Sequence, residues 1–182
     1  MSDTGEHLRA GSSSHAGDAL TELPHFRFAV GSFDSWLQLR NALEDSRLRG
    51  RALGSINCLA LERVFAGERI ATSFQEPVTV QKLAFPESRE MICCTSGALA
   101  DCLFDRLRSG SRSLEDALGH WLVPRHAAHF QAAVQDGKIL LWIRLTDADD
   151  ERRAYQSLLA NSSNSVGVHD LGAPPRTASS NG

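Results

Sequence analysis

Residues 114–145, LEDALGHWLVPRHAAHFQAAVQDGKILLWIRL, hold the patterns that decide the fold class of this chain. Pro124 suits the first turn of a helix, where its missing N–H costs nothing, and Gly137 suits the left-handed position that ends one. Between them, apolar side chains recur at helical spacing, at Ala127, Phe130, Ala133 and Val134. Residues 139–143 then run without a polar break, as in a strand covered on both faces. We therefore predict a helix followed by a strand in the middle of a sheet.

A strand–helix–strand pattern occurs on each side of the centre of the chain. The first unit comprises a strand at 26–30, a helix near 36–43 and a strand at 56–61. The second comprises a strand at 139–145, a helix starting near 149 and a short strand at 166–168. Two such units in one sheet give the ferredoxin-like split arrangement, and right-handed crossovers place both helices on one side. The sequence therefore predicts an α+β fold with a ferredoxin-like sheet made from two strand–helix–strand units.

Short polar residues mark where the helices of these two units begin. Asp34 or Ser35 can cap the first helix, and Thr146 or Asp147 can cap the second. We expect the second helix to face a core with its apolar residues Ala148, Ala154, Tyr155, Leu158 and Leu159.

The middle of the chain predicts an addition to this sheet and a helical layer. Residues 78–83 and 90–94 are interpreted as strands, which form either an extra hairpin or a long extended connection. Helices follow at 96–107 and at 114–122, and Ser113 can cap the second of them. Residues 96–136 therefore form a helical insertion between the two units, and its helices can cover the second face of the sheet.

The composition sets limits on the domain and its partners. The chain has 182 residues, 42% of them hydrophobic, which suffices for one packed domain, expected at 25–171. Residues 1–24 and 172–182 are rich in Gly, Ser and polar groups and are expected to be disordered tails. A formal charge of -3 gives no reason to expect a nucleic-acid partner. No apolar run approaches about 18 residues and no secretory apolar region is present, so we expect a cytoplasmic protein without membrane association.

The order of elements at 118–171 is distinctive. Leu118-Gly119 is followed by Val123-Pro124, which opens a helix with Phe130, and a Gly-Lys turn, a strand, an acidic helix and a Val-x-Val end come next. This C-terminal half resembles a bacterial family of small general-stress and heat-induced proteins, many of them uncharacterised. Many relatives carry a Gly- and Ala-rich, membrane-like segment before the Leu-Gly step, whereas this chain has the short, charged SGALADCLFDRLRSGSRS there. The resemblance implies an α+β domain, a link to stress and no enzyme activity.

Three histidines that lie close in sequence suggest a metal site. His126 and His129 are three residues apart, so they share one face of the predicted helix, and His120 lies just before it. Cys102 on the neighbouring helix is the best further ligand. The alternative is that these are surface or interhelical histidines beside Phe130, because such spacing alone is a weak signal. No cofactor other than a metal ion is expected.

Two adjacent cysteines suggest a redox site. Cys93 and Cys94 precede a predicted helix with Cys-x-x-Ser spacing, and a thiolate at a helix N-terminus has a lowered pKa. The alternative, which we favour, is that they are small thiols packed at the end of a strand. The four cysteines of the chain do not have the spacing of a disulfide framework.

Four arginines around the helical insertion suggest an anion site or a partner site, namely Arg106, Arg108, Arg112 and Arg125. Such a group is usually a solvated face, but it can also bind an acidic partner or a phosphate. Single-stranded nucleic acid would additionally need exposed aromatic side chains for stacking, and the chain has one Tyr and mostly core-patterned Phe residues. No nucleic-acid partner is therefore expected.

Two classes of function follow from these patterns. The first is a non-enzymatic domain that acts by self-association or by binding a protein partner, because sheets of this kind have open edges that pair easily. The alternative is a small-ligand or metal-binding protein, or an enzyme, that uses a His/Cys pocket between the sheet and the helical insertion.

Overall fold

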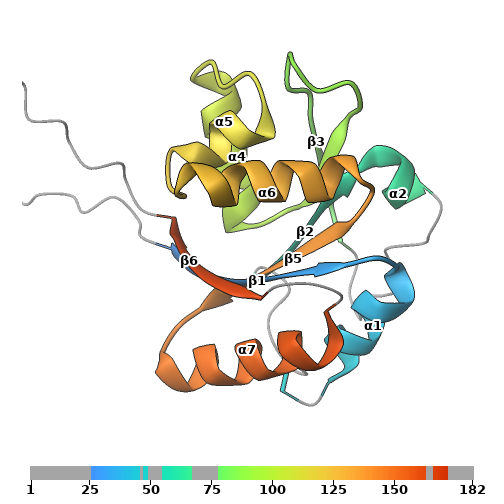
Figure 1. The fold of residues 1–182 in the computed structure, drawn as a ribbon, viewed down its shortest axis with the longest axis vertical. Coiled ribbons are helices and arrows are strands. Elements are labelled where there is room, and N and C mark those ends of the chain that lie inside the picture. The colour runs from blue at the N-terminus through green and yellow to red at the C-terminus, as the bar shows by residue number, and fades with distance from the viewer. Residues whose placement is uncertain (1–25, 46, 49–54, 67–77, 163–165, 172–182) are drawn as a thin grey trace, which may run out of the picture.

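The computed structural model describes residues 26–45, 47–48, 55–66, 78–162 and 166–171, and the predicted tails lie outside them. Within these residues the chain forms an α+β fold of six strands and six helices (Figure 1). The strands are β1 (Phe26–Phe33), β2 (Ile56–Leu61), β3 (Val80–Leu83), β4 (Ile92–Thr95), β5 (Ile139–Leu145) and β6 (Gly167–Leu171). The helices are α1 (Trp36–Glu44), α2 (Glu62–Ala66), α4 (Ala98–Arg108), α5 (Leu114–Gly119), α6 (Pro124–Gln135) and α7 (Ala148–Asn161). The predicted α+β class is confirmed.

The strands form one open antiparallel sheet in the order β3-β4-β2-β5-β1-β6. β5 lies in the middle, between β2 and β1, and residues 139–143 are all buried. Trp142 pairs with Val30 on one side and with Asn57 on the other. The prediction of a central strand covered on both faces is therefore confirmed.

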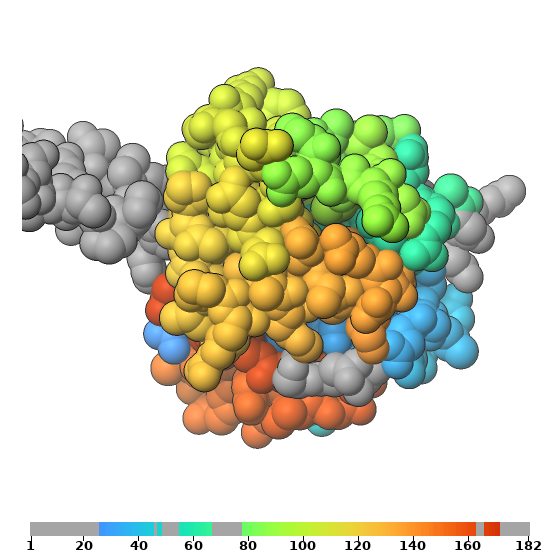
Figure 2. All heavy atoms as spheres, turned by 45° about the horizontal axis from the view of Figure 1, so that its top comes forward, coloured from blue at the N-terminus to red at the C-terminus, as the bar shows by residue number. Residues whose placement is uncertain are grey.

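Helices cover both faces of the sheet (Figure 1). The core on one face includes buried residues of α4, α5 and α6 together with β-strand residues such as Phe28 and Trp142. The core on the other face includes buried residues of α1 and α7 together with Ala29, Phe33 and Cys58. Figure 2 shows the first layer from outside, with the α4–α6 region in yellow to orange. The absence of a polar face at 139–143 follows directly, because each face of β5 contacts a helical layer.

The helix ends follow local chemistry. Ser35, Ser113 and Asp147 each accept a hydrogen bond from the backbone N–H three residues later, at 3.3, 3.0 and 2.8 Å. Pro124 lies in the first turn of α6, and Gly137 has a φ of 85° just after its end. These starts and stops confirm the local predictions and select Ser35 and Asp147 from the two pairs of candidates.

Two details of the predicted helices are wrong. The helix predicted at 114–122 ends at Gly119. In α7, Ala148, Tyr155 and Leu159 do not face a core: Ala148 is exposed in the first turn, and Tyr155 and Leu159 are 38% and 57% exposed. Ala154 and Leu158 are buried as predicted, and Tyr155 and Leu159 each lie one position, about 100° of helix, beyond one of them. Only a narrow face of α7 packs against the sheet, and the apolar pattern of the sequence overestimated the width of that face.

The middle of the chain extends the sheet. β3 and β4 pair as an antiparallel hairpin, with Val80 opposite Thr95 and Leu83 opposite Ile92, and β4 also pairs with β2. Of the two predicted alternatives, the extra hairpin is therefore correct. The helical insertion that follows consists of α4, α5 and α6, which together span residues 98–135. Among the helices of the described residues, none is both long and apolar enough to cross a membrane.

A buried asparagine fixes the turn from β4 into α4. Asn57 is fully buried, and its Nδ2 donates a hydrogen bond of 2.8 Å to the Thr95 carbonyl. Its Oδ1 accepts from the Leu99 backbone N–H at 3.4 Å, in the first turn of α4. Gly97 precedes the helix with a φ of 147°, and a Cβ added there would lie 2.5 Å from Asn57 Nδ2. Asn57 thus supplies the cap that glycine, which has no side chain, cannot.

Candidate functional site

A contact between two histidines joins α6 to the edge of the sheet. His126 lies in the first turn of α6, and His169 lies at the centre of β6. The centroids of their rings are 5.1 Å apart, and the ring planes make an angle of 78°. Both side chains are partly exposed, so the pair is accessible from solvent.

Aromatic side chains form the buried side of this histidine pair. Phe130, one turn along α6, has its ring centroid 5.3 Å from that of His169 and 5.2 Å from that of Trp142. The Trp142 and His169 centroids are 6.4 Å apart. The register explains the grouping, because Phe28 pairs with His169 and Val30 pairs with both Trp142 and Gly167. Three strands therefore bring these residues to one face of the sheet, below α6.

Burial and a neighbouring histidine lower the pKa of His169. Partial burial lowers the pKa of His169 below its ordinary value, and the nearby His126 lowers it further, while Asp170 opposes the change. Two imidazoles this close cannot both be protonated without repulsion. A neutral imidazole has a free nitrogen lone pair, which can accept a proton or bind a metal.

One buried polar atom beside the pair has no partner. Nε1 of Trp142 makes no hydrogen bond within the described part of the chain, although the side chain is 0% exposed. Its neighbours are aromatic rings, including those of Phe28 and Phe130, which offer no strong acceptor. Below His169, a Cβ on Gly167 would lie 2.7 Å from His169 Nε2, so glycine gives the imidazole room to lie across the edge strand.

The four residues predicted as metal ligands are not brought together. His120 follows α5 beside Trp121, with ring centroids 6.4 Å apart, and His129 is exposed beside Phe130. Cys102 lies on α4, and burial, then the carboxylates of Asp101 and Asp105, raise its pKa. Across the described residues, no group of three or more His, Cys, Asp or Glu side chains could hold a metal ion. Binding of a metal ion by His120, His126, His129 and Cys102 stays a prediction, and the structure does not group these four side chains around one point.

The predicted redox cysteines lie inside the sheet. Cys93 and Cys94 are consecutive buried residues of β4, so they point to opposite faces and belong to opposite cores. Burial raises the pKa of both thiols, most strongly that of Cys94. The α4 helix begins only at Ala98, so neither thiol lies at its N-terminus. These positions fit the favoured interpretation of packed thiols, since a redox cysteine needs a lowered pKa.

Three of the four predicted anion-binding arginines already have contacts. The Arg106 guanidinium lies 5.9 Å from the ring centroid of Trp121, and that of Arg108 lies 4.5 Å from the ring centroid of Phe104. Arg112 forms an ion pair of 2.9 Å with Glu87. Arg125 is exposed in the first turn of α6, beside His126. The structure therefore shows four separate surroundings, and binding of an acidic partner by the group stays a prediction.

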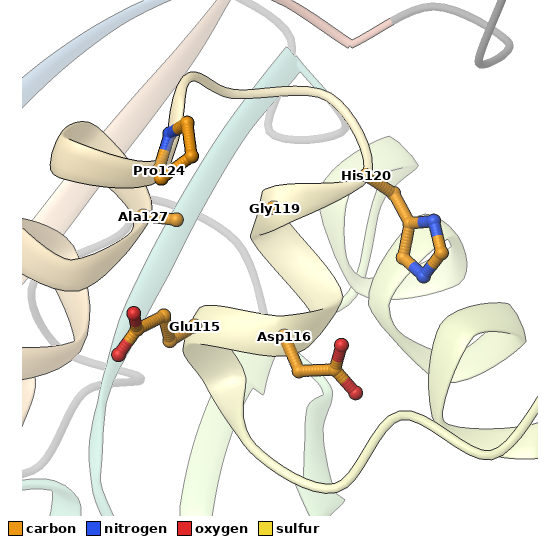
Figure 3. A pocket seen from close by; sticks show the side chains of 6 residues that line it. All are labelled: Glu115, Asp116, Gly119, His120, Pro124 and Ala127. Carbon is orange, nitrogen blue, oxygen red and sulfur yellow. The ribbon is translucent and has the colours of Figure 1, made fainter.

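A shallow hollow of about 270 Å³ lies between α5 and the start of α6. Its lining residues are Glu115, Asp116, Gly119, His120, Pro124 and Ala127. In Figure 3, Glu115 extends on the side of Ala127, whereas Asp116 and His120 extend on the other side of α5. The polar groups do not converge on one point, and Glu115 is already engaged with Gln131 of α6. This hollow is a weaker candidate than the histidine pair.

Comparisons with known proteins do not identify the chain. No family model, curated protein or solved structure matches it. The resemblance to general-stress proteins at 118–171 therefore stays a prediction.

Sequence reasoning missed His169 and Asn57. Each is a polar residue in a short apolar segment, GVHDL and INCLAL, and that interruption was the available signal. That signal does not identify the residues that contact them. His126 reaches His169, and Leu99 reaches Asn57, only through the packing of helices on the sheet.

Proposed function

We propose that this chain acts by association with a second copy of itself through the β6 edge of its sheet. The observation that carries the proposal is that β6 pairs with β1 alone and ends the strand order of the described residues. Figure 1 shows β6 at that end of the sheet. In an edge strand, alternate peptide groups point away from the sheet, where a strand of another chain can pair with them.

The arrangement of the strands supports the choice of this edge. The strand order β2-β5-β1-β6, with buried residues of α1 and α7 in the core on one face, supports the interpretation of these elements as a ferredoxin-like unit. In such a unit the outer strands are β2 and β6. Here β4 pairs with β2 and so covers that side, which leaves β6 as the edge of the unit that no other strand of the described residues covers.

The edge strand at the opposite end of the sheet, β3, is less suited to pairing with another chain. β3 carries Lys82, which forms an ion pair with Glu62, and Pro86 follows the strand. Lysine and proline on an edge strand discourage pairing with other chains. The β6 sequence GVHDL has neither, and its acidic residue, Asp170, lies 3.9 Å from Arg27 of β1. Pairing between identical edges produces a closed two-fold dimer, the commonest form of homo-oligomer.

The test compares lysine substitutions on the two edge strands. Val168 of β6 and Val80 of β3 are matched, because both are partly buried and both pack against the same core cluster. We expect the full chain to form a dimer by light scattering after size exclusion, in buffer with a chelator. Val168→Lys should give a monomer with unchanged circular dichroism, whereas Val80→Lys should remain a dimer.

Two outcomes would overturn this proposal. One is a full-length chain that stays monomeric at about 100 μM, a concentration at which a homodimer of micromolar affinity is almost fully formed. The other is a dimer that survives Val168→Lys and is lost with Val80→Lys, which would place the contact at the other edge.

A further inference from the structure

We infer that His126 and His169 form a binding site for a divalent transition-metal ion, with tetrahedral Zn²⁺ as the best fit. The site differs from the association edge, since it lies on the α6 face of the sheet. It also differs from the ligand set predicted by helical spacing, because its second histidine comes from a strand 43 positions further along the chain, 169 against 126. Within the described residues, no hydrogen bond or ion pair involves either imidazole.

The distance between the rings matches tetrahedral coordination. A metal about 2.0–2.1 Å from one nitrogen of each imidazole lies about 3.2 Å from each ring centroid, so an angle of about 109° places the centroids about 5.2 Å apart. Ligands at about 90°, as in octahedral or square-planar coordination, would bring the centroids to about 4.5 Å. The observed separation between His126 and His169 is 5.1 Å.

The ring centroids are the appropriate points to compare, because each lies almost on the axis of its Cβ–Cγ bond. Rotation about that bond turns the ring nitrogens but leaves the centroid nearly in place, and this torsion is broad for histidine. The angle of 78° between the planes of His126 and His169 is therefore compatible with both nitrogens turning toward one ion.

The surroundings favour a metal that keeps open positions. Each imidazole of the pair is partly exposed, so an ion can reach it from solvent. Phe130 and Trp142 close the inner side of the pair. Asp170 points to the other face of β6 by strand alternation and so does not add a ligand. The two remaining positions of a tetrahedral ion are left to water or to a small external ligand.

The test is metal binding by the full, untagged chain after treatment with a chelator. We expect calorimetric titration with Zn²⁺ to show about one ion per chain, and His126→Ala or His169→Ala to weaken binding by about tenfold or more. His120→Ala and His129→Ala are matched controls and should bind as the wild type does. Co²⁺ added to the wild type should give the intense visible absorption of a tetrahedral ion. This spectrum reports on the ligands of the ion rather than on the stability of the fold.

Four further variants make the result unambiguous. Replacement of His7, His15 and His25 together by alanine should leave binding unchanged. Should an alanine variant fail to fold, His169→Asn and His126→Gln provide closer replacements. Val168→Lys should still bind Zn²⁺ as a monomer, because its side chain lies on the opposite face of β6 from His169, so the site and the dimer can fail separately.

Several results would overturn the metal site. They are a wild type that binds no Zn²⁺, wild-type affinity in both His126→Ala and His169→Ala, and loss of binding in the triple N-terminal variant or in the two control variants instead. Octahedral Co²⁺ spectra would contradict the tetrahedral geometry.

Discussion

Replacement of Asn57 tests how the sheet and the α4 helix are joined. Asn57→Ala removes the donor to the Thr95 carbonyl and the acceptor for the Leu99 N–H, at 2.8 and 3.4 Å. Both groups are buried, and Gly97 offers no side chain to replace the cap. The result is a carbonyl left with the weak thiol donor Cys94 Sγ, at 3.4 Å, and a helix start without its side-chain acceptor.

The expected loss follows from these two groups. A buried carbonyl that loses its amide donor costs up to about 1–3 kcal/mol, and the weak thiol donor of Cys94 replaces little of it. A lost cap costs about 1 kcal/mol, and the long 3.4 Å bond to Leu99 places this case below that figure. We therefore expect the free energy of unfolding to fall by about 2–3 kcal/mol. Urea titration followed by circular dichroism and tryptophan emission measures it, and a loss below about 1 kcal/mol would refute the assignment.

Gly97→Ala completes a double-mutant cycle with Asn57→Ala. A Cβ at Gly97 would lie 2.5 Å from Asn57 Nδ2, and the φ of 147° strains any residue with a side chain. In the Asn57→Ala background the clash is absent and only the backbone strain remains. The two losses should therefore sum to more than the loss of the double variant, by about 1 kcal/mol or more. Strictly additive losses would show that the two residues do not interact.

Two further predictions concern His169 and the α7 helix. Because the pKa of His169 is lowered in the folded chain from an ordinary value of 6.5, the unfolded chain binds more protons there, so this contribution to stability is present above about pH 6.5 and is lost as the pH falls. Urea titrations at pH 7.5 and 5.5 should show a smaller pH dependence for His169→Phe than for the wild type, and an equal or larger one would contradict it. Leu158→Ala, at a fully buried position, should cost about 2–4 kcal/mol, whereas Leu159→Ala, at a position 57% exposed, should change stability by about 0.5 kcal/mol or less. Similar losses for both would mean that α7 presents a different face.

Local rules predicted the elements well because their causes are local. Pro124, Gly137 and the caps Ser35 and Asp147 act within one helical turn, so the sequence alone places these helix ends. The uninterrupted apolar run at 139–143 likewise predicts a central strand by itself, because a strand with two apolar faces must be covered on both. The exposed Tyr155 and Leu159 show the limit of such rules, because apolar spacing does not tell how wide a face the fold covers.

The candidate site could not be predicted in the same way. Helical spacing pairs His126 with His129, but His129 is exposed, and the ring of His169 lies 5.1 Å from that of His126. That contact requires the register of β6 on β1 and the seating of α6 over the sheet. Both depend on packing between segments far apart in the chain, for which a single sequence holds no local signal.

The most direct test of association through β6 is amide hydrogen exchange at low and high protein concentration, in buffer with a chelator. Where the dimer forms, we expect the amides of Gly167–Leu171 to exchange more slowly at high concentration, while those of Val80–Leu83 exchange at one rate throughout. Exchange across β6 that does not depend on concentration, or protection that appears at β3 instead, would contradict association through this edge.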